Sequence, residues 1–181
     1  MNRIKRFAAV AAATAVAALA PLTAAPAAQA TTTANHPGLT WELLNYGAGY
    51  AIQVGGPGGT ASDPYNGDTP AYYSLPVLCL NQDNRPAPPG IVIGFYNGWS
   101  LGEVEISRPV KGTELTSPEA ANTICRQQFG RNWRQAEFHD GHYGPNYSQT
   151  GGWTFWANGN LPKNVRFWVN INDQAANPWD N

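Results

Sequence analysis

The sequence predicts a single, loop-rich α+β domain in which one main helix packs on an irregular, mostly antiparallel sheet. The composition favours strands and loops over a helical bundle: charged residues make up only 13% of the chain, which contains 19 Gly, 15 Pro and 12% aromatic residues. A single stretch, at about residues 117–129, has both the start and the stop signals of a helix. Several other stretches alternate apolar and polar side chains, as half-buried strands do.

The first thirty residues have the pattern of a secretory signal peptide. Arg3, Lys5 and Arg6 form a basic start, an alanine-rich apolar stretch follows, and Ala28-Gln29-Ala30 provides a small-x-small cleavage site. We therefore expect residues 1–30 to be removed and the rest of the chain to be secreted and extracellular.

Residues 31–181 are expected to form one extracellular domain, with a loop-rich part at 31–73 and the core at 74–181. No stretch of this region approaches the roughly 18 apolar residues of a membrane-spanning helix, so we expect no membrane contact after cleavage. The region has eight basic and twelve acidic residues, a formal net charge of −4, which disfavours nucleic acid as a partner. We expect a monomer.

Two cysteines, Cys79 and Cys125, are present. In an oxidising compartment we expect them to form a disulfide bond. For a loop of this length, such a bond stabilises the fold by about 4 kcal/mol in the chain-entropy model. The alternative is a pair of buried free thiols.

Short strands are expected in the first half of the chain. Thr40–Asn45 and Gly49–Val54 flank a glycine turn. Ser74–Leu80 is a compact apolar run that suits a buried strand, and Pro76 places it at a sheet edge or at the start of a strand. Glu103–Ile106 alternates charged and apolar residues, which indicates a half-buried strand.

The main helix has clear signals at both ends. Thr116 or Ser117 can cap its first turn, Pro118 suits the first helical position, and Gly130 is a natural stop. We expect Cys125 to lie on the face that packs against the sheet.

Two further strands are expected after the helix. Trp133–Phe138 alternates, and a second short helix can follow His139. Val165–Ile171 is the last strand candidate, with side chains that alternate between two faces. One face holds Val165, Phe167, Val169 and Ile171, and the other holds Arg166, Trp168 and Asn170.

The densest group of titratable side chains is the segment Glu137-Phe138-His139-Asp140-Gly141-His142. Its histidines and carboxylates could bind Zn²⁺ or act as a general base, so His139, Asp140, His142 and Glu137 form the candidate catalytic set. Their spacing matches neither the H-E-x-x-H nor the G-x-S-x-G signature. The alternative is a loop that Asp140 turns and in which His139 has a structural hydrogen bond.

Polar side chains also gather at the end of the last expected strand. Asn170, Asn172 and Asp173 carry the oxygen ligands that Ca²⁺ prefers, but Ca²⁺ needs six to eight of them. Turn formation by Asn172-Asp173 is the alternative. Trp168 is either exposed for stacking on a ligand or covered by a second layer. The expected ligand-binding residues are Trp168, Asn170, Asn172, Asp173, His139, Asp140 and Tyr143.

Four blocks of the sequence resemble those of a family of small secreted bacterial proteins without an assigned function. The blocks are Leu75–Cys79 (LPVLC), Ala136–Gly141 (AEFHDG), Gly151–Trp153 (GGW) and Arg166–Trp179 (RFWVNINDQAANPW). The resemblance covers roughly residues 65–181. It implies export and a single domain, but no activity.

A weaker resemblance is to C-type-lectin-like domains, in which a strand leads to a helix with a Cys and a Trp-rich irregular half ends in a strand similar to W-x-N-D. Trp168, Asn172 and Asp173 resemble that last element with extra spacing. The chain departs from the pattern because it has two Cys rather than four and no Glu-Pro-Asn or Gln-Pro-Asp motif. Calcium-dependent sugar binding therefore does not follow from this resemblance.

Aromatic and amide side chains without a catalytic signature favour a non-enzymatic recognition domain. We expect its ligand to be a glycan or another cell-surface or cell-wall component. No cofactor is expected, and the sequence leaves binding of Ca²⁺ or Zn²⁺ open. The first alternative is a secreted hydrolase or metal-dependent enzyme that uses the Glu137–His142 segment. The second is an inhibitor or protein-interaction domain that uses the Gly55–Asp68 loop or the Arg85–Gly90 segment (RPAPPG).

Overall fold

The computed structural model describes residues 34–57 and 61–179, which belong to one compact unit. The expected signal peptide at residues 1–30 lies outside the described residues. The strands are β1 (Thr40–Tyr46), β2 (Ala51–Gly55), β3 (Ser74–Leu75), β4 (Leu78–Gln82), β5 (Gly98–Ile106), β6 (Val110–Lys111), β7 (Arg134–Gln135), β8 (Gly141–Tyr143), β9 (Gln149–Gly151), β10 (Thr154–Gly159) and β11 (Phe167–Trp168). The helices are α1 (Pro118–Phe129) and two single 3₁₀ turns, η2 (Gly112–Glu114) and η3 (Pro145–Tyr147).

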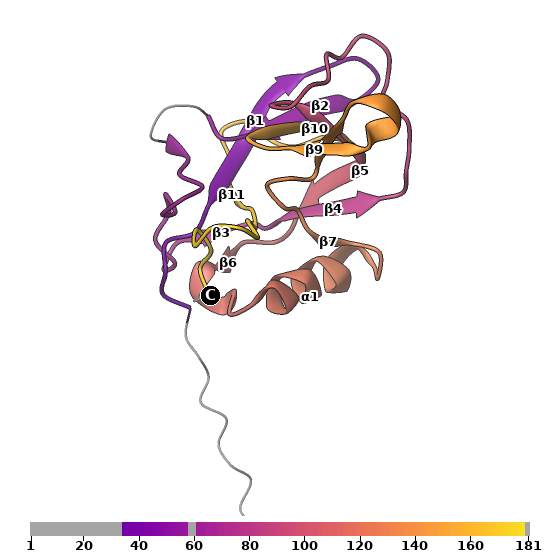
Figure 1. The fold of residues 1–181 in the computed structure, drawn as a ribbon. Helices are drawn as coiled ribbons and strands as arrows, with labels where there is room; N and C mark the ends of the chain where they lie inside the picture. The colour runs from indigo at the N-terminus through magenta and orange to yellow at the C-terminus, as the bar shows by residue number, and fades with distance from the viewer. Residues whose placement is uncertain (1–33, 58–60, 180–181) are drawn as a thin grey trace, which may run out of the picture. The chain divides into compact units, whose positions relative to one another are not determined.

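The strands form one large sheet in the order β11-β1-β2-β10-β5-β4-β7, with the β8–β9 hairpin attached to β5. A separate small sheet pairs β3 with β6. The β10–β5 pair is parallel and the other strand pairs are antiparallel. In Figure 1, α1 lies beside β7, away from β1 and β2. The expected α+β class, with one main helix and a mostly antiparallel sheet, is confirmed. No helix within the described ranges is long and apolar enough to span a membrane.

The helix α1 begins and ends at the expected residues. The hydroxyl of Ser117 accepts a hydrogen bond from the Ala120 amide at 3.1 Å, and Pro118 occupies the first turn. Gly130 ends the helix with a φ of +114°, a value that favours glycine. Cys125 lies at disulfide distance from Cys79, with their Cα atoms 5.6 Å apart, so the expected bond joins α1 to β4.

Several expected strands differ in extent from the observed ones. Ser74–Leu80 divides into β3 and β4 at Pro76, which has no backbone N–H to donate to a neighbouring strand. The strand expected at Glu103–Ile106 begins earlier, at Gly98. Trp133–Phe138 forms only the two-residue β7, and Val165–Ile171 forms only β11, with an isolated bridge after it at Asn170.

The last strand separates two apolar clusters, and this overturns the expectation that Trp168 contacts a ligand. Phe167 and Val169 pack into the larger cluster, which also contains Trp41, Val54, Leu80 and Phe155 from the main strands. Trp168 points the opposite way, into a second cluster with the disulfide and α1, and is fully buried. Its indole N–H donates to the Val110 carbonyl at 3.4 Å. Alternation along the strand thus places Trp168 in a second core layer rather than on the surface.

The part at 31–73 contributes more to the core than expected. Trp41 on β1 and Val54 on β2 are buried in the larger cluster, and β2 lies between β1 and β10 in the sheet. The division into a loop-rich part and a core at residue 73 therefore does not hold. Of the described residues after β2, Asp68 accepts hydrogen bonds from the Thr40 amide and the Arg166 guanidinium, which join it to β1 and to the segment before β11.

Candidate functional site

Two segments far apart in the sequence, Glu137–His142 and Asn170–Asp173, lie side by side. The Phe138 amide donates to the Asn170 carbonyl at 2.8 Å, and the Asn172 amide donates to Oε1 of Glu137 at 3.1 Å. Nε2 of His139 lies 3.9 Å from Oδ2 of Asp173. A hollow with an aromatic wall and a second, more polar hollow are lined by residues of these two segments.

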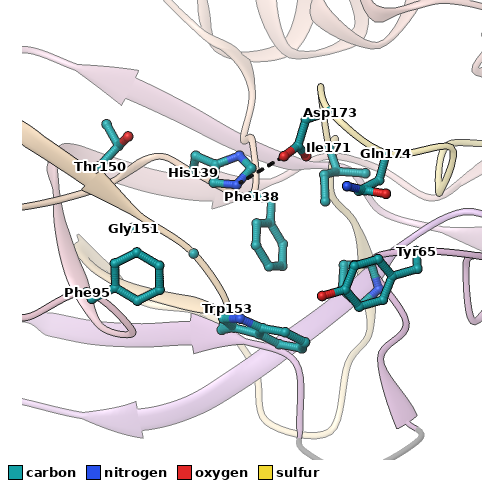
Figure 2. A pocket seen from close by; sticks show the side chains of 12 residues that line it. Tyr65, Phe95, Phe138, His139, Thr150, Gly151, Trp153, Ile171, Asp173 and Gln174 are labelled. Atoms are coloured by element: carbon teal, nitrogen blue, oxygen red, sulfur yellow. Dashed lines mark ion pairs between the residues drawn. The ribbon is translucent and has the colours of Figure 1, made fainter.

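The first hollow, which we call the aromatic pocket, has a volume of about 310 Å³, at the low end for a small-molecule site. Figure 2 shows three aromatic side chains along one wall, polar side chains along the other, and Phe138 between them. The aromatic wall consists of Tyr65, Phe95 and Trp153. The polar wall includes His139, Thr150, Asp173 and Gln174.

The aromatic wall is exposed to solvent. Tyr65 is 57% exposed, Phe95 49% and Trp153 39%, whereas Trp41, Trp99, Trp168 and Trp179 are buried. The ring of Trp153 lies 6.5 Å from Tyr65 and 5.6 Å from Phe138, both at edge-to-face angles. Trp153 is the only one of the seven Trp residues classed as exposed.

The Gly151-Gly152-Trp153 sequence shapes this pocket at each of its three positions. A Cβ at Gly151 would overlap the carbonyl of Phe95, and a Cβ at Gly152 would overlap the ring of Phe138. Both glycines therefore permit a close approach that other residues would prevent. Trp153 has a φ of +76°, a strained conformation for a bulky residue, and such strain clusters at functional sites.

The polar wall is oriented by Glu137, whose side chain is only 11% exposed. Its Oε2 accepts the His139 amide at 2.6 Å, and its Oε1 lies 3.1 Å from Nδ1 of the same imidazole. The second ring nitrogen of His139 is the one that faces Asp173, on the side of the pocket. His139 can therefore offer Nε2 to a ligand while Glu137 fixes the ring.

Asp140, expected to bind a ligand or act in catalysis, instead holds the loop. Its two carboxylate oxygens accept hydrogen bonds from Arg134 at 2.5 and 2.8 Å, and one of them also accepts the Glu137 amide at 2.6 Å. Burial by itself would lower the pKa of Arg134, but the hydrogen bonds and charge of Asp140, with the charge of Glu137, raise it. Asp140 is 6% exposed, so its role is structural.

The candidate catalytic set does not converge on one point. His142 pairs with Trp99 across strands, and its Nε2 lies 3.4 Å from the Gln82 amide nitrogen. His139 lines the aromatic pocket, whereas Asp140 is paired with Arg134. Within residues 34–57 and 61–179, no group of three or more His, Cys, Asp or Glu side chains is placed to hold a metal ion.

The remaining expected ligand residues lie apart from the aromatic pocket or at its margin. Asn170 and Asn172 line the polar hollow, of about 290 Å³, where the amide of Asn170 donates to the Asn172 side chain at 2.9 Å. Tyr143 packs against Phe95, with ring centroids 5.9 Å apart. Of the seven residues expected to bind a ligand, only His139 and Asp173 line the aromatic pocket.

The sequence does not single out Tyr65 and Phe95, which lie in two different turns, or Thr150, which lies in β9. The Gly-Gly-Trp block was the available signal, because paired glycines before an aromatic residue indicate a close backbone approach. Comparisons with protein-family models, with curated proteins and with solved structures find no match.

Proposed function

We propose that this protein is a secreted, non-enzymatic recognition domain that binds carbohydrate in the aromatic pocket. The observation that carries the proposal is the exposed indole of Trp153 opposite the polar side chains of His139 and Asp173. A sugar ring has an apolar C–H face and a rim of hydroxyl groups, so it matches a pocket with one aromatic and one polar wall. Small-molecule sites commonly combine apolar walls with a few polar groups in this way.

The polar wall offers both kinds of hydrogen-bonding group that hydroxyls need. The Asp173 carboxylate is an acceptor, the Thr150 hydroxyl can donate and accept, and Gln174 carries an amide. Asp173 is 61% exposed at its side chain, so a ligand can reach it without displacing the core. Charge-assisted hydrogen bonds to such a carboxylate are stronger than neutral ones.

A non-enzymatic role is favoured by the surroundings of His139. Across the described ranges, no hydroxyl or thiol is hydrogen-bonded to its ring. Nucleophilic catalysis usually needs such a contact between base and nucleophile. The Glu137–His139 pair is therefore better suited to ligand orientation than to acyl or glycosyl transfer.

A protein-interaction role is the second candidate, favoured by the loop after the RPAPPG segment. Val92 is 77% exposed and Tyr96 66% exposed on this loop, and exposed apolar groups can mark a contact surface. Recovery of the same partner from culture medium by the wild type, and its loss with Val92→Asp, would favour this role.

We also propose that the fold is C-type-lectin-like and that residues 1–30 direct export. A Cys-bearing helix bonded to a strand and a Trp-rich irregular second half support the first statement. Superposition of an experimental structure on a C-type lectin domain tests it. N-terminal sequencing of the protein from culture medium, with Thr31 expected as the first residue, tests the second.

Titration calorimetry against a panel of soluble glycans and cell-wall polysaccharides tests the main proposal. We expect Trp153→Ala to lower the affinity at least tenfold, about 1.4 kcal/mol, while circular dichroism stays unchanged. Tyr72→Ala is the matched control, because Tyr72 is 69% exposed and stacks on Tyr73 rather than lining the pocket. Absence of binding to every glycan, or full binding by Trp153→Ala, would overturn the proposal.

A further inference from the structure

The aromatic wall extends on both sides of Trp153, and we infer that the site binds an internal stretch of a linear, uncharged polysaccharide. This inference rests on the carbohydrate-binding function proposed above. It adds the class of ligand: a chain that runs through the site, rather than a single terminal sugar or an acidic polymer.

The geometry of the wall is that of a row open at both ends. Figure 2 shows Phe95 and Tyr65 on opposite sides of Trp153. The end rings, Phe95 and Tyr65, are more exposed than the central indole. The rings of Tyr96 and Tyr143, which do not line the pocket, lie with their centroids 4.9 and 5.9 Å from that of Phe95. Aromatic surface therefore continues past the pocket.

A single sugar ring in the pocket leaves part of the row uncovered. The pocket volume of about 310 Å³ suits a small ligand such as one sugar ring. If that ring stacks on Trp153, it covers only part of the exposed surfaces of Tyr65 and Phe95, which line the pocket on either side. Neighbouring units of a chain would cover the rest, and burial of these apolar faces would add to affinity.

The rings of the row are held in place before any ligand binds. The Tyr65 amide donates to Oδ1 of Asp63 at 2.9 Å, which fixes the turn that presents Tyr65. The Phe95 carbonyl accepts the Gly152 amide at 3.1 Å, which ties the second end of the row to Trp153. A preorganised surface loses less conformational entropy on binding, so even shallow contacts contribute to affinity.

The charges around the row exclude acidic polymers. Neither Lys nor Arg lines the pocket, whereas Asp173 does. Asp63 lies two residues from Tyr65, and hydrogen bonds from the Asn66 side chain and from the amides of Asn66 and Tyr65 lower its pKa. The lowered pKa favours the ionised form of Asp63. Acidic side chains with no Lys or Arg in the pocket lining to offset them would repel uronate, sulfate or phosphate groups on a chain.

A length series tests the inference with the mature chain, residues 31–181. The probe is the uncharged polymer that binds best in the panel, used as its monosaccharide through its hexasaccharide and as its carboxymethylated form. We expect affinity to rise with length, and carboxymethylation to weaken binding. Tyr65→Ala and Phe95→Ala should each lower hexasaccharide affinity about twofold to tenfold, as expected for one aromatic contact, and lower monosaccharide affinity by a smaller factor. Tyr72→Ala should change neither.

Equal affinity for the monosaccharide and the hexasaccharide, or tighter binding of the carboxymethylated chain, would overturn the inference but leave carbohydrate binding intact. Full hexasaccharide affinity in both Tyr65→Ala and Phe95→Ala would do the same. If no saccharide of any length binds, the proposed function fails and the inference fails with it. The melting temperature of each variant shows whether it is folded. Because both side chains are exposed, we expect the melting temperatures to stay close to that of the wild type.

Discussion

The ring of Phe138 lies 5.6 Å from the indole of Trp153, and it lies equally close to the buried indole of Trp41. Phe138 therefore belongs both to the larger apolar cluster and to the aromatic pocket. Because cores are close-packed, displacement of this ring should affect stability and ligand binding together.

Gly152→Ala tests that coupling directly. The new Cβ would overlap the Phe138 ring, and overpacking of this kind costs about 1–3 kcal/mol. We expect the free energy of unfolding, measured in urea, to fall by this amount and glycan affinity to fall with it. Gly94→Ala is the control, because its nearest contact is the end of the Asn97 side chain at 3.2 Å. Equal stability of the two variants would contradict the role given to Phe138.

Trp153 should show an inverted order of substitution effects. A protein with Gly at a given position is normally less stable than one with Ala there. At position 153, however, the φ of +76° favours Gly, because a residue with a Cβ is strained in this conformation. We expect Trp153→Gly to be more stable than Trp153→Ala by about 1 kcal/mol in urea unfolding. Both variants should lose glycan binding to the same extent. A more stable Ala variant would show that the strain is absent.

How much of the fold follows from the sequence depends on how local the signal is. The helix was predicted nearly to the residue, because Ser117, Pro118 and Gly130 act within one turn of its ends. The length of β5 and the position of β2 inside the sheet depend on pairing with distant strands. Local alternation cannot predict such pairing, since it indicates which face is buried but not by what.

The candidate site was predicted in part for the same reason. His139 and Asp173 could be identified because they lie in dense polar clusters. Trp168 could not be assigned from its strand alone, since alternation left open whether a second layer covered it, and α1 with the disulfide supplies that layer. Tyr65 and Phe95 lie in loops without periodicity, so only the tertiary structure brings them to Trp153.

Glu105 should make stability depend on pH in the direction opposite to that of most carboxylates. Partial burial, and then the negative charge of Glu103, raise its pKa in the folded state. The ionised form is thus less favourable in the folded chain than in the unfolded one. Ionisation of Glu105 therefore lowers the free energy of unfolding as the pH rises through the folded pKa. We expect Glu105→Gln to be slightly more stable than the wild type at pH 7. The difference should vanish below about pH 4.

Thermal unfolding from pH 3.5 to 8 measures this difference. Because the residue as a whole is still largely accessible to solvent, water screens the charge and the effect should be small. Glu114→Gln, which changes a carboxylate in η2, is a suitable comparison on the same chain. This prediction would be contradicted if Glu105→Gln stabilised the protein less at pH 7 than at pH 4.

The Arg134–Asp140 pair should stabilise the loop that carries His139. Asp140→Asn removes the charge and replaces one of the two accepting oxygens by an NH₂ donor, and a hydrogen bond to a charged group contributes about 1.5–3 kcal/mol. We expect that loss in urea unfolding, together with weaker glycan binding, because the remaining oxygen cannot replace all the contacts that hold Arg134 and the Glu137 amide. Glu119→Gln is the control: its ion pair with Arg126 is exposed, so its cost should stay below about 1 kcal/mol. Equal costs in both variants would mean that Asp140 has no special structural role.

The disulfide should account for a large share of the stability of the domain. It joins residues 46 positions apart, and closing such a loop lowers the entropy of the unfolded chain by an amount worth about 4 kcal/mol. For a domain of this size, that corresponds to a fall of about 8–16 °C in the melting temperature of the Cys79→Ala/Cys125→Ala variant.

The bond acts mainly through the unfolded state, so its loss should leave the native site unchanged. At a temperature where the double variant is still folded, we therefore expect glycan affinity equal to that of the wild type. Reduction of the wild-type protein should lower its melting temperature by a similar amount, which separates the effect of the bond from that of the two side chains. A fall of less than about 2 °C in both experiments, below the shift expected for 1 kcal/mol, would show that the Cys79–Cys125 pair does not constrain the chain.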